Sequence, residues 1–242
     1  MLLFNTIMPM NCFDIERGIF VYTGKDYQTE CHAHFFIEAV FSLSGSLSVG
    51  TINRQYSTVQ AAIIGSNVPH TFSCLDSECQ LFFFDPTTDI GERIARRHDL
   101  KRRGMVVFDA FGAERIKKEY ALYALDHDAR HLHRFSKDID ERIQKCLNNI
   151  QVVDTEEAIT VAKLAERLSL SESRLAHLFK EQLGISIHQY ILWKRIEAAI
   201  TKWQEGCSFT ECAYFAGFSD SSHFNKVVKK MFGVAPSLGQ KE

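Results

Sequence analysis

The feature that most constrains this chain is an internal repeat near its carboxyl end. The segment 165–171 (AERLSLS) matches the segment 213–219 (AYFAGFS) at an offset of 48 residues. Beyond these segments the offset becomes 49, so that Gly184 pairs with Gly233. A repeat in sequence usually encodes a repeated supersecondary unit. The pattern therefore predicts two similar units in the last third of the chain.

Each copy has the pattern of two short helices joined by a turn. In the first copy, Thr160 and Ser171 stand at N-cap positions, where a side-chain oxygen can accept a hydrogen bond from an unpaired backbone N–H. Gly184 then ends the second helix, because a residue without a Cβ readily adopts the left-handed conformation of a C-terminal cap. The equivalent positions of the second copy are Ser208, then Ser219 or Asp220 as alternative caps, and Gly233 followed by Pro236.

Residues 187–205, between the copies, are predicted to form one long helix because their apolar residues recur at helical spacing. A stiff spacer of this kind would hold the two units at a fixed separation. A single unit could be an ordinary helical hairpin, but two copies with matching caps and glycines favour two helix-turn-helix readers. Such a pair suits neighbouring major-groove segments on one face of DNA, about 34 Å apart.

The residues of both copies resemble the AraC/XylS family of transcription regulators. The resemblance rests on LAHLFKEQLGIS at 175–186, QYI at 189–191, GFSDSSHF at 217–224 and MFGVAP at 231–236. It covers about a third of the chain, and Val228 stands where the family usually has an aromatic residue. The resemblance implies a regulator, and not an enzyme, that binds double-stranded promoter DNA. It also implies a homodimer and contact with RNA polymerase.

The exposed positions after the caps of the longer helices are the candidates for contact with DNA. The resemblance implies that six of these residues face the bases, namely Ser173, Ala176, His177, Ser222, Asn225 and Lys226. The candidate phosphate contacts are Arg174, Lys180, Lys229 and Lys230. Phosphate contacts fix the register on the duplex without reading its sequence. The alternative for any one of these residues is an ordinary solvated side chain.

The charge of the chain does not by itself attract DNA. The formal net charge is -2 and the isoelectric point is about 6.6. Residues 155–242 contain 11 Lys and Arg against 10 Asp and Glu. Binding must therefore depend on a local arrangement of basic groups, and it should be sensitive to salt. A modest affinity of the single chain also favours dimers or tandem sites.

The amino-terminal part of the chain has a different pattern. Between residues 18 and 85, short apolar runs alternate with turn residues, which predicts a β-sandwich or small β-barrel. The run 82–84 (FFF) is expected to be a buried final strand. The basic stretch 93–103 is expected to be a solvated helix face or loop. Residues 113–125 and 137–150 have helical periodicity.

The segment 32–38 (HAHFFIE) resembles the first cupin motif, and His70 would be the histidine of the second motif. The candidate metal ligands are His32, His34, Glu38 and His70. If the segment is one strand, positions 32, 34 and 38 share a face, because side chains alternate along a strand. Imidazoles with one carboxylate suit a divalent transition metal. Gly65 and Asn67 depart from the second motif, and a barrel of this class can instead bind a small effector without metal.

These patterns predict an α+β chain, with an N-terminal cupin-like β-barrel or sandwich followed by an all-α domain in which a long helix joins two helix-turn-helix units. The expected domains are a cupin-like effector-sensing domain at 10–90, a helical linker or dimerisation region at 91–150, and the double helix-turn-helix DNA-binding domain at 151–240. The alternative is a metal-dependent cupin enzyme with a helical appendage. The effector, the operator and the choice between activation and repression are left open.

The remaining sequence evidence concerns the compartment. The start of the chain lacks the pattern of a secretory signal, and no apolar run approaches the ~18 residues of a membrane-spanning helix. The seven cysteines include no C-x-x-C pair. Such cysteines are typical of reduced thiols in a cytoplasmic protein.

Overall fold

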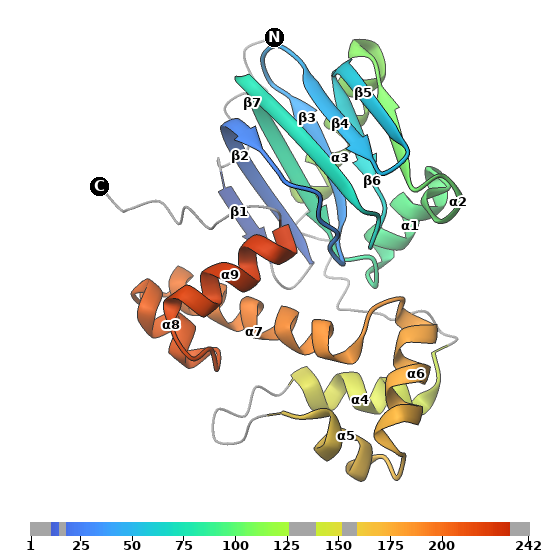
Figure 1. The fold of residues 1–242 in the computed structure, drawn as a ribbon, viewed down its shortest axis with the longest axis vertical. Helices are drawn as coiled ribbons and strands as arrows, with labels where there is room; N and C mark the ends of the chain where they lie inside the picture. The colour runs from blue at the N-terminus through green and yellow to red at the C-terminus, as the bar shows by residue number, and fades with distance from the viewer. Residues whose placement is uncertain (1–10, 15–17, 126–138, 152–158, 233–242) are drawn as a thin grey trace. The chain divides into compact units, whose positions relative to one another are not determined.

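The computed structural model describes residues 11–14, 18–125, 139–151 and 159–232, and it divides into two compact units, 1–134 and 135–242. The first unit contains β1 (Asn11–Asp14), β2 (Ile19–Gln28), β3 (Ile37–Ser42), β4 (Leu47–Thr51), β5 (Arg54–Val59), β6 (Ala61–Ile64), β7 (His70–Phe84), α1 (Asp89–Arg97), α2 (Leu100–Arg103), β8 (Met105–Phe108) and α3 (Ala110–Leu125). The second contains α4 (Glu141–Gln151), α5 (Val161–Arg167), α6 (Glu172–Leu183), α7 (Ile187–Gln204), α8 (Phe209–Phe215) and α9 (Ser221–Phe232) (Figure 1).

The strands of the first unit form an antiparallel sheet in the order β1-β2-β7-β3-β6-β8, and β4 pairs with both β7 and β5. The long strand β7 pairs with β2 on one side. On its other side it pairs first with β4, through residues 70–73, and then with β3, through residues 79–84. Because one strand serves two neighbours in succession, the sheet curves into a barrel-like form (Figure 1). The predicted α+β class with an amino-terminal barrel-like sheet is confirmed.

Two details of this unit differ from the sequence-based expectation. Residues 82–84 are a buried strand, but they are not the final one, because β8 follows α1 and α2 and pairs with β6. The basic stretch 93–103 forms the end of α1 and all of α2. Its Arg and Lys side chains are exposed as expected, whereas Ile94 and Leu100 are buried and attach these helices to the sheet.

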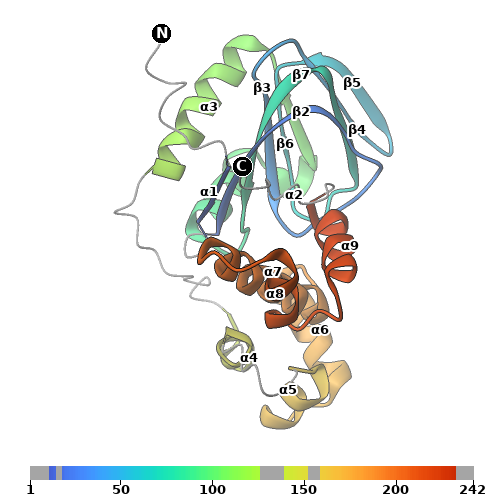
Figure 2. The ribbon, with the colours of Figure 1, turned by 90° about the vertical axis from the view of Figure 1, so that its left-hand side faces the viewer.

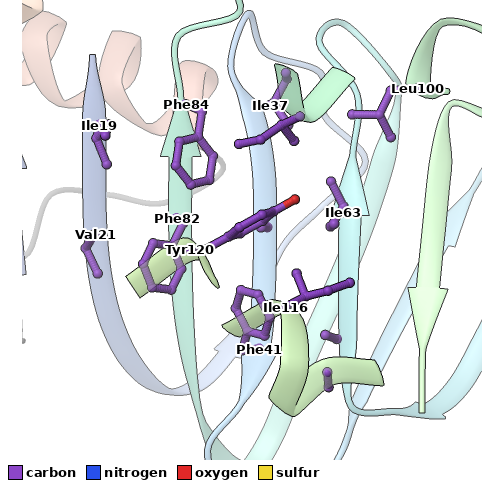
Figure 3. Close-up of a cluster of buried hydrophobic side chains, with 14 residues drawn as sticks. Ile19, Val21, Ile37, Phe41, Ile63, Phe82, Phe84, Leu100, Ile116 and Tyr120 are labelled. Atoms are coloured by element: carbon purple, nitrogen blue, oxygen red, sulfur yellow. The ribbon is translucent and has the colours of Figure 1, made fainter. Parts of the chain in front are cut away.

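Helices α1, α2 and α3 cover one face of the sheet (Figure 2). Alternate residues of the strands, such as Phe82 and Phe84, pack there against Tyr120 of α3 (Figure 3). Burial of each such large side chain stabilises the fold by about 1.5–3 kcal/mol. The intervening residues Phe83 and Glu38 point to the other face of the curved sheet, because neighbouring side chains of a strand alternate. That interior is where the candidate metal ligands lie.

The second unit is organised around α7, which confirms the long helix predicted between the two copies. Ser186 and Gln189 form a capping box at its start, and Trp193 and Ile196 are fully buried along its length. Helices α4, α6, α8 and α9 contact α7. Gly233, Pro236 and the predicted helix start at residue 137 lie outside the described residues. Within the described part of the chain, no helix has both the length and the hydropathy to cross a bilayer.

Candidate nucleic-acid interface and metal-binding cluster

The first helix-turn-helix unit consists of α5 and α6. The hydroxyl of Thr160 accepts a hydrogen bond from the N–H of Lys163 (3.3 Å), and the hydroxyl of Ser171 accepts one from the N–H of Arg174 (3.2 Å). Gly184 ends α6 in the left-handed conformation, with φ of 72°. Both predicted N-caps and the glycine C-cap are therefore confirmed. The core of α6 is formed by the buried residues Leu175, Leu178 and Phe179, and Leu183 is only partly buried.

The second unit consists of α8 and α9 and repeats this arrangement. Ser208 and Glu211 form a capping box at the start of α8. Asp220 caps α9, because its Oδ1 accepts a hydrogen bond from the N–H of His223 (2.7 Å). The structure thus selects Asp220 from the two caps left open by the sequence. The ring of Phe224 lies 5.0 Å from the rings of Phe209 and Phe218, which ties both helices and the turn together.

The six candidate base-facing residues lie at equivalent places on the two longer helices. Residues 173, 176 and 177 of α6 have the spacing i, i+3, i+4, and residues 222, 225 and 226 of α9 have the same spacing, so each set shares one helix face. Ala176 and Asn225 are half-buried, and the other four are exposed. The four candidate phosphate contacts are all exposed. The structure therefore brings the six candidate base-facing residues together in two sets of three, one on α6 and one on α9. Each set lies beside buried core positions of its helix.

A cluster of titratable side chains lies inside the first unit. His32 and His34 precede β3, Glu38 belongs to β3, and His70 is the first residue of β7. The prediction that positions 32, 34 and 38 share one strand is wrong, because β3 begins only at Ile37. Instead, His32 pairs with His70 through two backbone hydrogen bonds of 3.0 and 2.9 Å. This non-local pairing brings the four candidates together.

The ligand atoms of the four residues all lie within 4.8 Å of one another. Glu38 Oε2 lies 2.8 Å from His34 Nε2 and 3.1 Å from His70 Nε2. Two buried atoms of the cluster, His32 Nε2 and Glu38 Oε1, have no hydrogen-bond partner among the described residues. A buried polar atom without a partner costs about 1–3 kcal/mol, so such atoms call for an explanation.

The backbone fixes how each imidazole presents its nitrogens. Nδ1 of His32, His34 and His70 lies 2.8–3.1 Å from a backbone carbonyl oxygen, which can only accept a hydrogen bond. Each Nδ1 therefore carries a proton, and a neutral ring directs the lone pair of Nε2 into the cluster. Two such lone pairs facing the Glu38 carboxylate would repel it. The cluster thus requires positive charge, either on its imidazoles or from a bound cation.

The electrostatics of the cluster agree with this requirement. Burial raises the pKa of Glu38, but hydrogen bonds from His34 and His70 outweigh it and leave the pKa well below its usual range. Burial lowers the pKa of His70, and the hydrogen bond and charge of Glu38 outweigh this and raise it. Burial and the neighbouring His70 lower the pKa of His32. Glu38 is therefore a fully buried carboxylate in its charged form, which is the form that binds metal.

These residues fit a divalent transition metal. A metal with ligand distances of about 2.0–2.2 Å keeps its ligand atoms roughly 3–4 Å apart, so the observed spread of up to 4.8 Å would have to contract by about 1 Å. Hydrogen bonds from Nδ1 to carbonyl groups are also the usual way in which a ligand histidine is oriented. The accepting carbonyl oxygens belong to Glu30, Phe36 and Val68. Because they are backbone atoms, no residue type in the sequence indicates them.

The helical unit is similar to DNA-binding domains of known proteins. A family model described as a helix-turn-helix domain matches residues 164–241. The probable transcriptional regulator LumQ of Photobacterium leiognathi is 27% identical over 94% of this chain and 98% of its own length. The arabinose operon regulatory protein of Escherichia coli is 31% identical over 41% of this chain and 34% of its own length. This chain is a DNA-binding regulator of transcription, and its helix-turn-helix domain is similar to that of the arabinose operon regulator.

The fold of the whole regulator is also found among solved structures. The crystal structure of ToxT from Vibrio cholerae covers 91% of the regulator, and 95% of the ToxT chain is covered in turn, with a TM-score of 0.55. The sequence identity is 15%, so this likeness concerns the fold alone. The curated relatives named above are regulators of transcription, which favours the regulator over the metal-dependent enzyme that the cluster alone left open.

The two longer helices of the helix-turn-helix units, α6 and α9, differ in charge. Arg174 and Lys180 of α6 are balanced by Glu172 and Glu181. In contrast, α9 carries Lys226 and two further lysines in its last turn, and it contains no acidic residue. Of these two helices, α9 therefore has the larger positive charge, which is the kind of charge that phosphate contacts require.

Proposed function

We propose that the regulator places α6 and α9 in neighbouring major-groove segments of promoter DNA, with the two sets 173, 176, 177 and 222, 225, 226 facing the bases. The observation that carries this proposal is the equivalence of the two sets, which share spacing, accessibility and capped helix starts. Asn225 and Lys226 offer directional hydrogen bonds to base edges, each worth about 1–3 kcal/mol of discrimination when bidentate. Ala176 offers only an apolar contact.

The test separates base reading from phosphate contact within one helix. A preferred sequence is first selected by the wild type from a random duplex library. Asn225→Ala should lower affinity for this sequence by about 5- to 150-fold while leaving affinity for unrelated DNA unchanged, as expected for the loss of about 1–3 kcal/mol of discrimination. Lys230→Ala, the matched control on the same helix, should weaken binding to both DNAs equally. Equal losses on both DNAs for Asn225→Ala would remove that residue from the reading set.

We further propose that the barrel-like unit senses a small effector and that His32, His34, Glu38 and His70 bind a divalent transition metal there. The metal proposal is supported by the two unpartnered buried atoms and by the three oriented imidazoles. A protein of similar fold, ToxT, has been crystallised with an unsaturated fatty acid bound, which supports a small-molecule effector. The bound metal would supply a Lewis acid to which a polar effector group can attach.

The metal is tested on the purified full chain by elemental analysis after exposure to zinc, iron, manganese and nickel in turn. One equivalent of metal should remain on the wild type after desalting, and His34→Ala should lose it. His98→Ala is the matched control. His98 is a half-buried histidine of the same unit, and its ring forms a hydrogen bond with the Tyr120 hydroxyl and lies outside the cluster. A metal-free wild type that binds its selected DNA normally would refute the metal and leave the DNA-binding proposal standing.

Effector binding can regulate DNA binding only if the effector has different affinities for two states of the chain. We propose that the second state involves a homodimer formed through α3, whose side chains Phe111 (81% exposed) and Leu122 (61% exposed) are large, apolar and on the surface. Sedimentation of the wild type should show a dimer, and Leu122→Glu should shift it toward the monomer. A wild type that stays monomeric at micromolar concentration would refute this contact.

A further inference from the structure

Two cysteines flank an irregularity in the central strand of the first unit. Where β7 pairs with β2, Glu78 lies opposite Lys25 and Cys74 lies opposite Tyr27. The three residues 75–77 of β7 therefore face a single residue of β2, Asp26, in a bulge. The N–H of Asp76 donates a hydrogen bond to the Asp26 carboxylate (2.8 Å) and closes the bulge. Cys74 lies at one end of the bulge, and Cys79 lies one residue beyond the other end, opposite Gly24.

The sulfur atoms of Cys74 and Cys79 lie 3.1 Å apart in a hydrogen bond, and both residues are fully buried. A disulfide needs a separation of about 2.05 Å, so bonding requires the sulfurs to approach by only about 1 Å. Among the cysteines that the structure describes, no other pair has its two sulfur atoms in such contact. The backbone N–H of Tyr27 also donates a hydrogen bond to Cys74 Sγ (3.3 Å).

The surroundings prepare the two sulfurs for different roles. The hydrogen bond with Cys79 and, to a smaller extent, that from the Tyr27 N–H lower the pKa of Cys74, although burial opposes this shift. The hydrogen bond with Cys74 and burial raise the pKa of Cys79. A thiolate, and not a thiol, is the form that attacks peroxides. Cys74 thus has the character of the attacking sulfur, and Cys79 that of the resolving one.

We propose that Cys74 and Cys79 are a redox-active dithiol that a hydroperoxide converts reversibly into a disulfide. The Cys74 thiolate attacks the peroxide O–O bond, takes one oxygen as a sulfenic acid and releases the other as hydroxide or alkoxide. Cys79 then attacks the sulfenic sulfur, forms the S–S bond and releases water. In total, two thiols are oxidised by two electrons, and one hydrogen peroxide is reduced to two waters.

The bulge explains how a buried pair can react and what its reaction would change. Leu75 is 56% exposed, and its neighbour Asp76 is also on the surface, so a local opening of residues 75–78 would let hydrogen peroxide reach the sulfurs. The bulge is also held to the loop after β3, because the N–H of Glu78 donates a hydrogen bond to the Ser44 hydroxyl (2.9 Å). A disulfide across the bulge would shift this contact in the middle of the effector-sensing sheet.

The sequence offers a direct test on the full chain. Trypsin cuts after Arg54 and Arg93 and at no residue between them, so the peptide 55–93 contains Cys74 and Cys79 and no other cysteine. The reduced protein is treated with hydrogen peroxide, alkylated with N-ethylmaleimide and digested. Compared with the doubly alkylated peptide from the reduced protein, the peptide from the oxidised protein should lack both alkyl groups and two hydrogens. Dithiothreitol should restore both reactive thiols. A peptide that keeps two alkylated cysteines while the exposed Cys31 is oxidised would overturn the proposal.

Two variants distinguish a paired reaction from general oxidation. Cys79→Ala should leave Cys74 as a sulfenic or higher acid, detectable as added oxygen, because its partner is absent. Cys146→Ala is the matched control, since Cys146 is also fully buried, and it should form the disulfide at the wild-type rate. The wild-type measurement stands even if Cys79→Ala fails to fold. A disulfide that joins Cys74 or Cys79 to any third cysteine in place of its partner would also overturn the proposal.

Discussion

The charge difference between the two reading helices gives a quantitative prediction. Lys229 and Lys230 lie exposed in the last turn of α9, and neither forms an ion pair within the described residues. Each phosphate contact changes the slope of log K against log salt by about 0.9. The double variant Lys229→Ala with Lys230→Ala should therefore lower the magnitude of the slope by about 1.8. Between 50 and 200 mM salt, the wild type should lose roughly tenfold more affinity than the variant.

The assay is fluorescence anisotropy of a labelled duplex carrying the selected sequence, titrated at four or more salt concentrations. Lys118→Ala is the control. Lys118 is an exposed lysine of α3, in the first unit, and it forms an ion pair with Glu114 of the same helix. Its slope should equal that of the wild type. Circular dichroism should show the same helix content in the double variant and the wild type. With the helix content matched, an unchanged slope in the double variant would refute the two phosphate contacts.

Three further predictions concern the stability of the helical unit, which tryptophan fluorescence reports because both tryptophans, Trp193 and Trp203, lie in it. Trp193→Ala should lower the free energy of unfolding by about 3–5 kcal/mol, since the residue is fully buried on α7; a loss below about 1 kcal/mol would contradict its core position. Gly184→Ala should cost about 1–2 kcal/mol because φ is 72° there, whereas Gly184→Asn should cost less. Ser208→Ala should cost about 0.5–2 kcal/mol by removing a helix cap, and urea denaturation that shows no change would exclude that role.

The helical unit could be predicted closely because its signals are local. An N-cap such as Ser171 acts on an N–H three residues away, and Gly184 ends its helix through its own backbone conformation. The same signals recur in the second copy at an offset of 48 or 49 residues, which supports the prediction. The choice between Ser219 and Asp220 could not be made, because either oxygen can serve as a cap and only the path of the turn decides.

The barrel-like unit was harder to predict because its decisive contacts are non-local. The residue types of the metal-binding cluster were evident, but the backbone pairing of His32 with His70, 38 positions apart, overrode the single strand expected for residues 32–38. Strand β8 was missed because a run of four apolar residues cannot be told from part of a helix by periodicity. The contact of Cys74 with Cys79 depends on a bulge that no sequence motif indicates.

Two helices of one chain are expected to read DNA together, and hydroxyl-radical footprinting measures this directly. On its selected sequence, the wild type should protect two stretches of backbone on one face of the duplex, with centres about 34 Å apart, one helical turn. Asn225→Ala should weaken the protection at one of them before the other. A single protected stretch, or two stretches on opposite faces of the duplex, would contradict the paired reading units.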